Sequence, residues 1–175
     1  MIDSSFFLAI LMDGLLAAVA AIGFAIISNP PRQAIAISAF LAAVGHGARY
    51  FLMHCDALQY PITSASFIAA FLIGLLSIPF ARKIHCPAEV FSFPSLLPMI
   101  PGMFAYKSIL GLTKFLHAVE SDEASIYLID FLKNGFTAIF VLFGLVVGVA
   151  IPIFIFHRQS FSMTRKRIHP ATSVK

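Results

Sequence analysis

Five long, largely apolar runs divide the chain and dictate what it can fold into. A helix that crosses a bilayer needs about 20 mostly apolar residues. The runs lie at residues 6–28, 34–53, 62–80, 90–106 and 135–156. Only 11% of the residues are charged, whereas a soluble domain averages about 25%. Lipid must therefore be the solvent for most of the surface. We predict an all-α membrane protein of about five transmembrane helices.

The fourth run differs from the others because prolines and a glycine interrupt it. Pro94, Pro98, Pro101 and Gly102 cannot all lie in one regular helix. We expect a single polytopic transmembrane domain over residues 1–156 with a broken fourth segment, followed by a basic tail at 157–175. Because the second run is also marginal, a protein of four spans stays open as an alternative.

The positive charges indicate how the spans are oriented. With five spans, eight of the twelve Lys and Arg residues fall on one side, including all five of the tail. The other side receives Arg49, Lys107, Lys114 and Lys133, together with an acidic loop at 120–123. The positive-inside rule then places the C-terminus in the cytoplasm and the N-terminus outside. Since the basic residues lie at the ends of apolar runs, the net charge of +4 does not indicate nucleic-acid binding.

The two cysteines give no sign of a disulfide or a metal site. Cys55 and Cys86 fall in successive loops, which lie on opposite sides of the membrane, so they cannot be bridged. The chain has no spacing typical of metal ligands, and we expect neither a metal nor another cofactor.

Ionisable residues inside the second run are the strongest functional indication. His46 and Arg49, in Gly45-His46-Gly47-Ala48-Arg49, are three residues apart and share a helix face. Ionisable groups in a membrane are costly and mostly face a bundle interior or a wet cavity. They are candidate substrate-binding residues. The alternative is a histidine satisfied by a neighbouring helix and an arginine that reaches the interface.

Asp13 is the one ionisable residue inside the first apolar run. A carboxylate about two turns into a membrane helix must be paired, hydrated or protonated. We consider Asp13 and His46 candidate proton carriers, and Asp13 also a candidate partner for Arg49. The alternative is that the first helix starts later and leaves Asp13 near the interface.

The break in the fourth run supplies the remaining candidates. Broken helices at membrane depth occur where the backbone is buried in protein or lines a cavity. Pro101 and Gly102, with Tyr106 and Lys107 just after them, are therefore further candidate substrate-binding residues. An ordinary kink is the alternative.

No enzyme motif such as H-E-x-x-H, G-x-S-x-G, a P-loop or CxxC occurs in the sequence. An intramembrane enzyme would depend on His46 and Asp13 alone. We therefore predict that the chain is not an enzyme.

Three sequence pieces, taken in order, resemble the threonine/serine exporter family. They are Gly23-Phe24-Ala25 leading into Asn29-Pro30-Pro31-Arg32, the His46 motif described above, and Pro98-Met99-Ile100-Pro101-Gly102 with Ala105-Tyr106. The chain looks like the small second subunit of the split, two-subunit form. This resemblance implies a bacterial inner-membrane secondary exporter of threonine and serine, or of succinate in some split members, driven by the proton gradient.

We therefore expect one subunit of a proton-coupled exporter of small polar metabolites. Its partners would be the lipid bilayer, its small-molecule substrate, and a second membrane subunit of the same family or another copy of this chain. The alternative function is a non-transporting membrane subunit that stabilises or regulates a partner protein.

Overall fold

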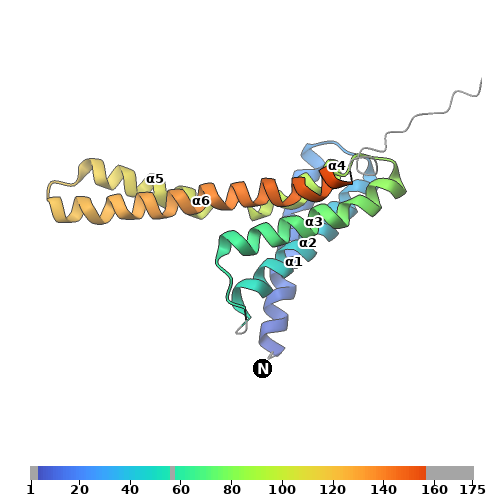
Figure 1. The fold of residues 1–175 in the computed structure, drawn as a ribbon, viewed down its shortest axis with the longest axis horizontal. Coiled ribbons are helices and arrows are strands. Elements are labelled where there is room, and N and C mark those ends of the chain that lie inside the picture. Colours follow the sequence, from blue (N-terminus) through green and yellow to red (C-terminus); the bar gives the residue numbers. More distant parts are fainter. Residues whose placement is uncertain (1–3, 56–57, 157–175) are drawn as a thin grey trace, which may run out of the picture.

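The computed structural model describes residues 4–55 and 58–156 and confirms an all-helical membrane architecture. The helices are α1 (Ser4–Ile27), α2 (Arg32–His54), α3 (Ile62–Ile84), α4 (Glu89–Leu96), the short 3₁₀ helix η1 (Leu97–Met99), α5 (Gly102–His117) and α6 (Ser121–Ile155). Prolines mark the boundaries, since Pro31 and Pro61 immediately precede α2 and α3. Helices α1 to α4 and the C-terminal part of α6 form a bundle, and α5 extends from it beside α6 (Figure 1).

Within residues 4–55 and 58–156, four helices are long and apolar enough to cross a membrane, namely α1, α2, α3 and α6. The segment Glu89–Met99 and α5 form a pair bent by 47°, which makes a fifth crossing if the pair is one span. The packing of α3 on α6 supports five crossings, because these two helices run in the same direction. Gly144 lies against Thr63, and further along both helices Gly74 lies against Val149. Two parallel helices need a return crossing between them, and the bent pair supplies it if the pair is one span.

Small residues bring α3 and α6 into close contact. A Cβ atom on Gly148 would lie 2.6 Å from the carbonyl oxygen of Phe67, and one on Gly144 would lie 3.3 Å from that of Thr63. Both glycines are buried. The Gly144-xxx-Gly148 pair therefore packs helix against helix and does not face lipid, as expected for small residues in membrane interfaces.

We expect Gly148→Ala to destabilise the protein and Gly23→Ala to leave it unchanged or slightly more stable. Alanine stabilises a helix by about 1 kcal/mol relative to glycine, so the Gly23→Ala control should not lose stability if its new side chain meets no neighbour. A Cβ on Gly23 meets no atom within 4 Å. At Gly148 the rigid backbone of Phe67 cannot move aside, and overpacking typically costs about 1–3 kcal/mol. Thermal unfolding in detergent measures both, and equal midpoints for the two variants would contradict the packing described.

The last helix is longer than the fifth apolar run. The expectation of a loop around Asp122 and Glu123 is wrong, because α6 begins at Ser121 and both carboxylates lie in its first turn. Negative charge is favourable there, since it faces the positive end of the helix dipole. With 35 residues, α6 is about 52 Å long, well beyond the ~30 Å hydrocarbon core.

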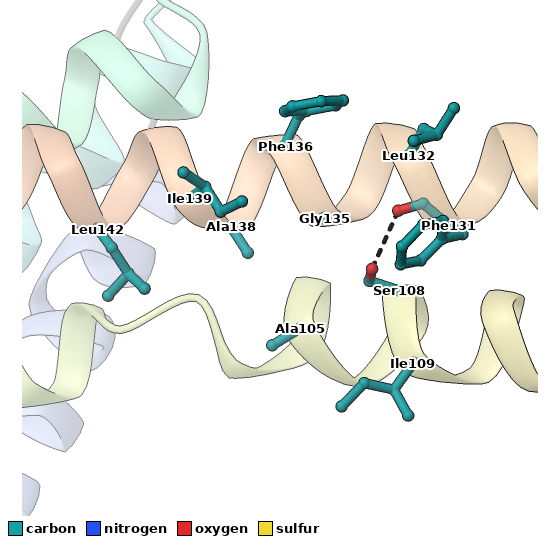
Figure 2. A pocket seen from close by; sticks show the side chains of 10 residues that line it. All are labelled: Ala105, Ser108, Ile109, Phe131, Leu132, Gly135, Phe136, Ala138, Ile139 and Leu142. Atoms are coloured by element: carbon teal, nitrogen blue, oxygen red, sulfur yellow. Dashed lines mark hydrogen bonds between the residues drawn. The ribbon is translucent and has the colours of Figure 1, made fainter.

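Much of α6 lies outside the bundle. Gly144 is level with Thr63, close to the start of α3. Residues 121–143 therefore extend about 34 Å past α3, and α5 packs chiefly on them. We call α5 together with residues 121–143 the arm. Figure 2 shows its two helices side by side, joined by a hydrogen bond of 3.0 Å from Ser108 Oγ to the carbonyl of Phe131. The long, horizontal hairpin in Figure 1 is this arm.

Candidate functional site

Two ionisable residues predicted from separate runs lie against each other. Nδ1 of His46 on α2 is 3.1 Å from Oδ2 of Asp13 on α1. Asp13 is nine residues from the start of α1, and His46 is eight residues from the end of α2. Because these helices are antiparallel neighbours, the two side chains meet at one depth, about 12–14 Å from the same end of the bundle. The carboxylate and the imidazole therefore form a polar pair inside the membrane-spanning part.

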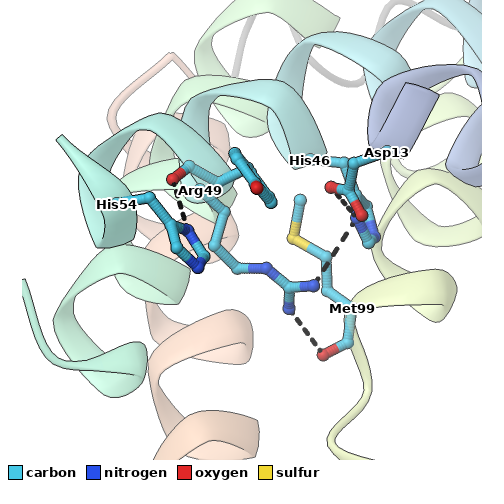
Figure 3. Close-up of polar contacts among 6 residues, drawn as sticks. Asp13, His46, Arg49, His54 and Met99 are labelled. Atoms are coloured by element: carbon cyan, nitrogen blue, oxygen red, sulfur yellow. Dashed lines mark hydrogen bonds and ion pairs between the residues drawn. The ribbon is translucent and has the colours of Figure 1, made fainter. Parts of the chain in front are cut away.

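Arg49 extends this pair toward the broken segment. Its Nη1 donates a hydrogen bond of 3.2 Å to the carbonyl oxygen of Met99 at the end of η1. Its Nη2 is 3.5 Å from Nδ1 of His46. Figure 3 shows the three side chains in a row that runs from α1 through α2 to the break. We call Asp13, His46, Arg49 and the Met99 carbonyl the polar row.

The break itself provides the acceptor for Arg49. Ile100 leaves the helical conformation with ψ of 128°, which interrupts the helix before Met103, the residue whose N–H would bond the Met99 carbonyl in a continuous α-helix. The Met99 carbonyl is thereby released from a regular helix ladder and accepts from the guanidinium instead. The break is evident from the sequence, but the role of this carbonyl is not, because it depends on the position of the carbonyl beside α2.

Glycine at position 45 lets the broken segment approach α2. A Cβ there would lie 2.9 Å from Cε of Met99 and closer still to the side chain of Ile73. A hydrogen bond also joins α4 to α2, since Oγ of Ser95 donates to the carbonyl of Ser38 at 2.8 Å. The break is thus held against the helix that carries His46 and Arg49.

Burial differs between Asp13 and His46. The side chain of His46 is 7% exposed, whereas that of Asp13 is 37% exposed. Nε2 of His46 is buried and has no hydrogen-bond partner within residues 4–55 and 58–156. Asp13 is therefore the accessible end of the row, and His46 the enclosed one.

The other predicted site residues do not join this cluster. Pro101 is buried at the break, and Gly102 begins α5 in open space. Tyr106 is 61% exposed on the arm. Lys107 lines a groove between α5 and α6 with Lys114 and Lys133, away from Arg49. The geometry of one chain therefore unites Asp13, His46 and Arg49 with the break, but not with Tyr106 or Lys107.

The described side chains were also compared with the ligand sets of metal sites. Within the part of the chain that the structure describes, no three His, Cys, Asp or Glu side chains gather in a candidate metal site. Cys55 and Cys86 are both free thiols at opposite ends of α3.

Comparison with known proteins decides the family. A family profile described as "Threonine/Serine exporter, ThrE" matches residues 13–155, which include the polar row and the arm. The chain belongs to the threonine/serine exporter family. As a member of this family it is a multi-pass membrane protein, and the family is one of transporters and not of enzymes.

One relative of this exporter-family chain is an uncharacterized protein of Haemophilus influenzae (strain ATCC 51907 / DSM 11121 / KW20 / Rd). The two are 35% identical over 154 residues, which cover 88% of this chain and 50% of the relative. The chain thus spans about half the length of that relative. No solved structure matches the present chain.

Proposed function

We propose that this chain is one half of a proton-coupled exporter of small polar metabolites that carry a carboxylate, such as threonine, serine or a dicarboxylate like succinate. The family match supports a threonine/serine exporter. The observation that carries the proposal is the polar row, because it places a carboxylate, an imidazole and a guanidinium in contact within membrane-spanning helices. Ionisable side chains at such depth are typical of proton relays and substrate pathways.

His46 can exchange a proton with Asp13, and its Nδ1 contacts one group that accepts a hydrogen bond and one that donates it. When Nδ1 carries a proton, it donates to the Asp13 carboxylate at 3.1 Å. When Nδ1 is bare, it can accept from Nη2 of Arg49, which is 3.5 Å away. Only one of these contacts exists at a time. Loss or gain of one proton would therefore shift His46 between α1 and the guanidinium.

The guanidinium would bind the substrate carboxylate. It already bonds the Met99 carbonyl through Nη1 and retains further donors in its planar fork. A carboxylate near Arg49 would compete with that carbonyl and loosen the tie between α2 and the broken segment. Substrate binding and movement of the break would thereby be coupled, which alternating access requires. The accessible Asp13 would exchange protons with the side predicted to be outside.

Two observations favour a partner half. The chain covers only half of its longer relative, and the arm extends from the bundle with apolar side chains exposed along it. A second membrane subunit of the family, or a second copy, would pack against the arm. The same observations also fit a second candidate function, a non-transporting subunit that stabilises or regulates a partner. An arm that only packs against a partner does not require the polar row.

Efflux from loaded cells tests the proposal. Threonine, serine and succinate would be measured with and without this chain, and with and without a candidate partner half. We expect one compound to leave faster only when both halves are present. If none of the three compounds shows a difference while the chain is confirmed in the membrane, the exporter is refuted and the accessory subunit favoured.

A further inference from the structure

The arm carries a group of polar side chains that do not belong to the polar row. A groove of about 460 Å³ runs between α5 and α6 on this face. Its polar lining consists of Lys107, Lys114, Tyr127, Asp130, Lys133 and Asn134. We call it the lysine groove. We propose that the lysine groove binds the phosphate group of an anionic lipid.

The charge of the groove is not neutralised by the residues that the structure describes. Its three lysines face one carboxylate, Asp130, and none of the three forms an ion pair with any residue that the structure describes. Nζ of Lys114 lies 5.5 Å from the ring centre of Tyr127, which orients the ammonium group over the groove. Positive side chains from two different helices therefore line one hollow, and a bound anion would neutralise their charge.

The position of the groove favours a lipid as the source of that anion. Lys133 and Asn134 immediately precede the uncharged run that occupies the rest of α6. The charged sequence of the arm thus ends where the apolar run begins, which is the level of lipid phosphates at a bilayer surface. A second hollow, lined almost only by apolar side chains such as Ile109, Phe136 and Ile139, lies between the same two helices (Figure 2). Acyl chains can cover such a surface while the phosphate stays near the lysines.

The chemistry fits a phosphate diester. Three ammonium groups supply charge, and the Asn134 amide and the Tyr127 hydroxyl can donate hydrogen bonds to phosphate oxygens. Basic pockets between membrane helices bind anionic headgroups on the cytoplasmic or matrix side of membranes, and we propose the same chemistry for this groove. Free inorganic phosphate offers the same oxygens, so the test must separate the two sources. The inference does not depend on the proposed transport function.

Native mass spectrometry of the full-length chain, released from nanodiscs, tests the proposal. The discs would contain equal amounts of phosphatidylglycerol and phosphatidylcholine. We expect phosphatidylglycerol to be retained preferentially. Lys107→Gln, Lys114→Gln or Lys133→Gln should each lower that preference about fivefold, the factor for one lysine near an anionic surface. Lys83→Gln at the end of α3 is the matched control and should leave the preference unchanged.

One variant in the same groove should act in the opposite direction. Asp130→Asn removes the carboxylate of the groove and should raise the preference for phosphatidylglycerol, a gain that misfolding cannot produce. Equal retention of both lipids by the unaltered chain would overturn the proposal. Displacement of bound phosphatidylglycerol by millimolar inorganic phosphate or succinate would overturn the lipid as the natural occupant.

Discussion

Asp13→Asn should reduce export at least about tenfold and remove its dependence on the proton gradient. Asparagine keeps the size of the side chain and can still accept from Nδ1 of His46, but it cannot take up a proton. The hydrogen bond also loses its charge, and bonds to charged groups contribute about 1.5–3 kcal/mol, which is a factor of roughly 10 to 150 in an equilibrium. The measurement is efflux at fixed substrate load with and without an imposed pH gradient.

His46→Ala should have an effect of the same kind, because it removes the group that faces both Asp13 and Arg49. Asp122→Asn is the matched control. Asp122 lies in the exposed first turn of α6, so its loss should leave export unchanged. Membrane abundance must be equal for all variants. Full export by Asp13→Asn with its gradient dependence intact would refute the proton role of the polar row.

The polar row could largely be predicted from the sequence. Asp13, His46 and Arg49 interrupt apolar runs, and the cost of placing them in lipid already implied that they must find partners. The sequence also suggested Asp13 as a partner for Arg49. The structure instead places His46 between them, because its ring lies closer to α1 than the guanidinium does. Which pair forms depends on helix rotation, and periodicity alone does not determine that rotation.

The arm could not be predicted in the same way. Residues 121–134 mix Ser, Asp, Glu, Lys and Asn with apolar residues, a composition that suits a loop as well as an amphipathic helix. They form a helix because α5 packs along them, with Ser108 bonded to Phe131 across the contact. Such tertiary support overrides local preference. Tyr106 and Lys107 were expected to bind substrate because they follow the break, but the bend of 47° carries them onto the arm.

The second large effect is expected at Arg49. Arg49→Gln should lower export by an order of magnitude or more and also increase hydrogen exchange at residues 97–105. Glutamine is shorter and uncharged, so it cannot both bond the Met99 carbonyl and approach His46. The carbonyl then loses a charge-assisted hydrogen bond in a site with little water, and such bonds contribute about 1.5–3 kcal/mol. Exchange followed by mass spectrometry reports the loosened break, and efflux reports the lost function.

Arg49→Lys separates the two roles of the guanidinium. Lysine keeps the positive charge but presents a single nitrogen instead of a planar fork. If the charge alone matters, for example to attract a carboxylate, this variant should export almost normally. If the fork must join the Met99 carbonyl to His46, it should fail almost as severely as Arg49→Gln. We expect the second result, because the two contacts of Arg49 leave from different nitrogens, 3.2 Å from Met99 and 3.5 Å from His46. Arg32→Gln, exposed at the start of α2, is the control, and equal losses for Arg32→Gln and Arg49→Gln would show that general positive charge is responsible.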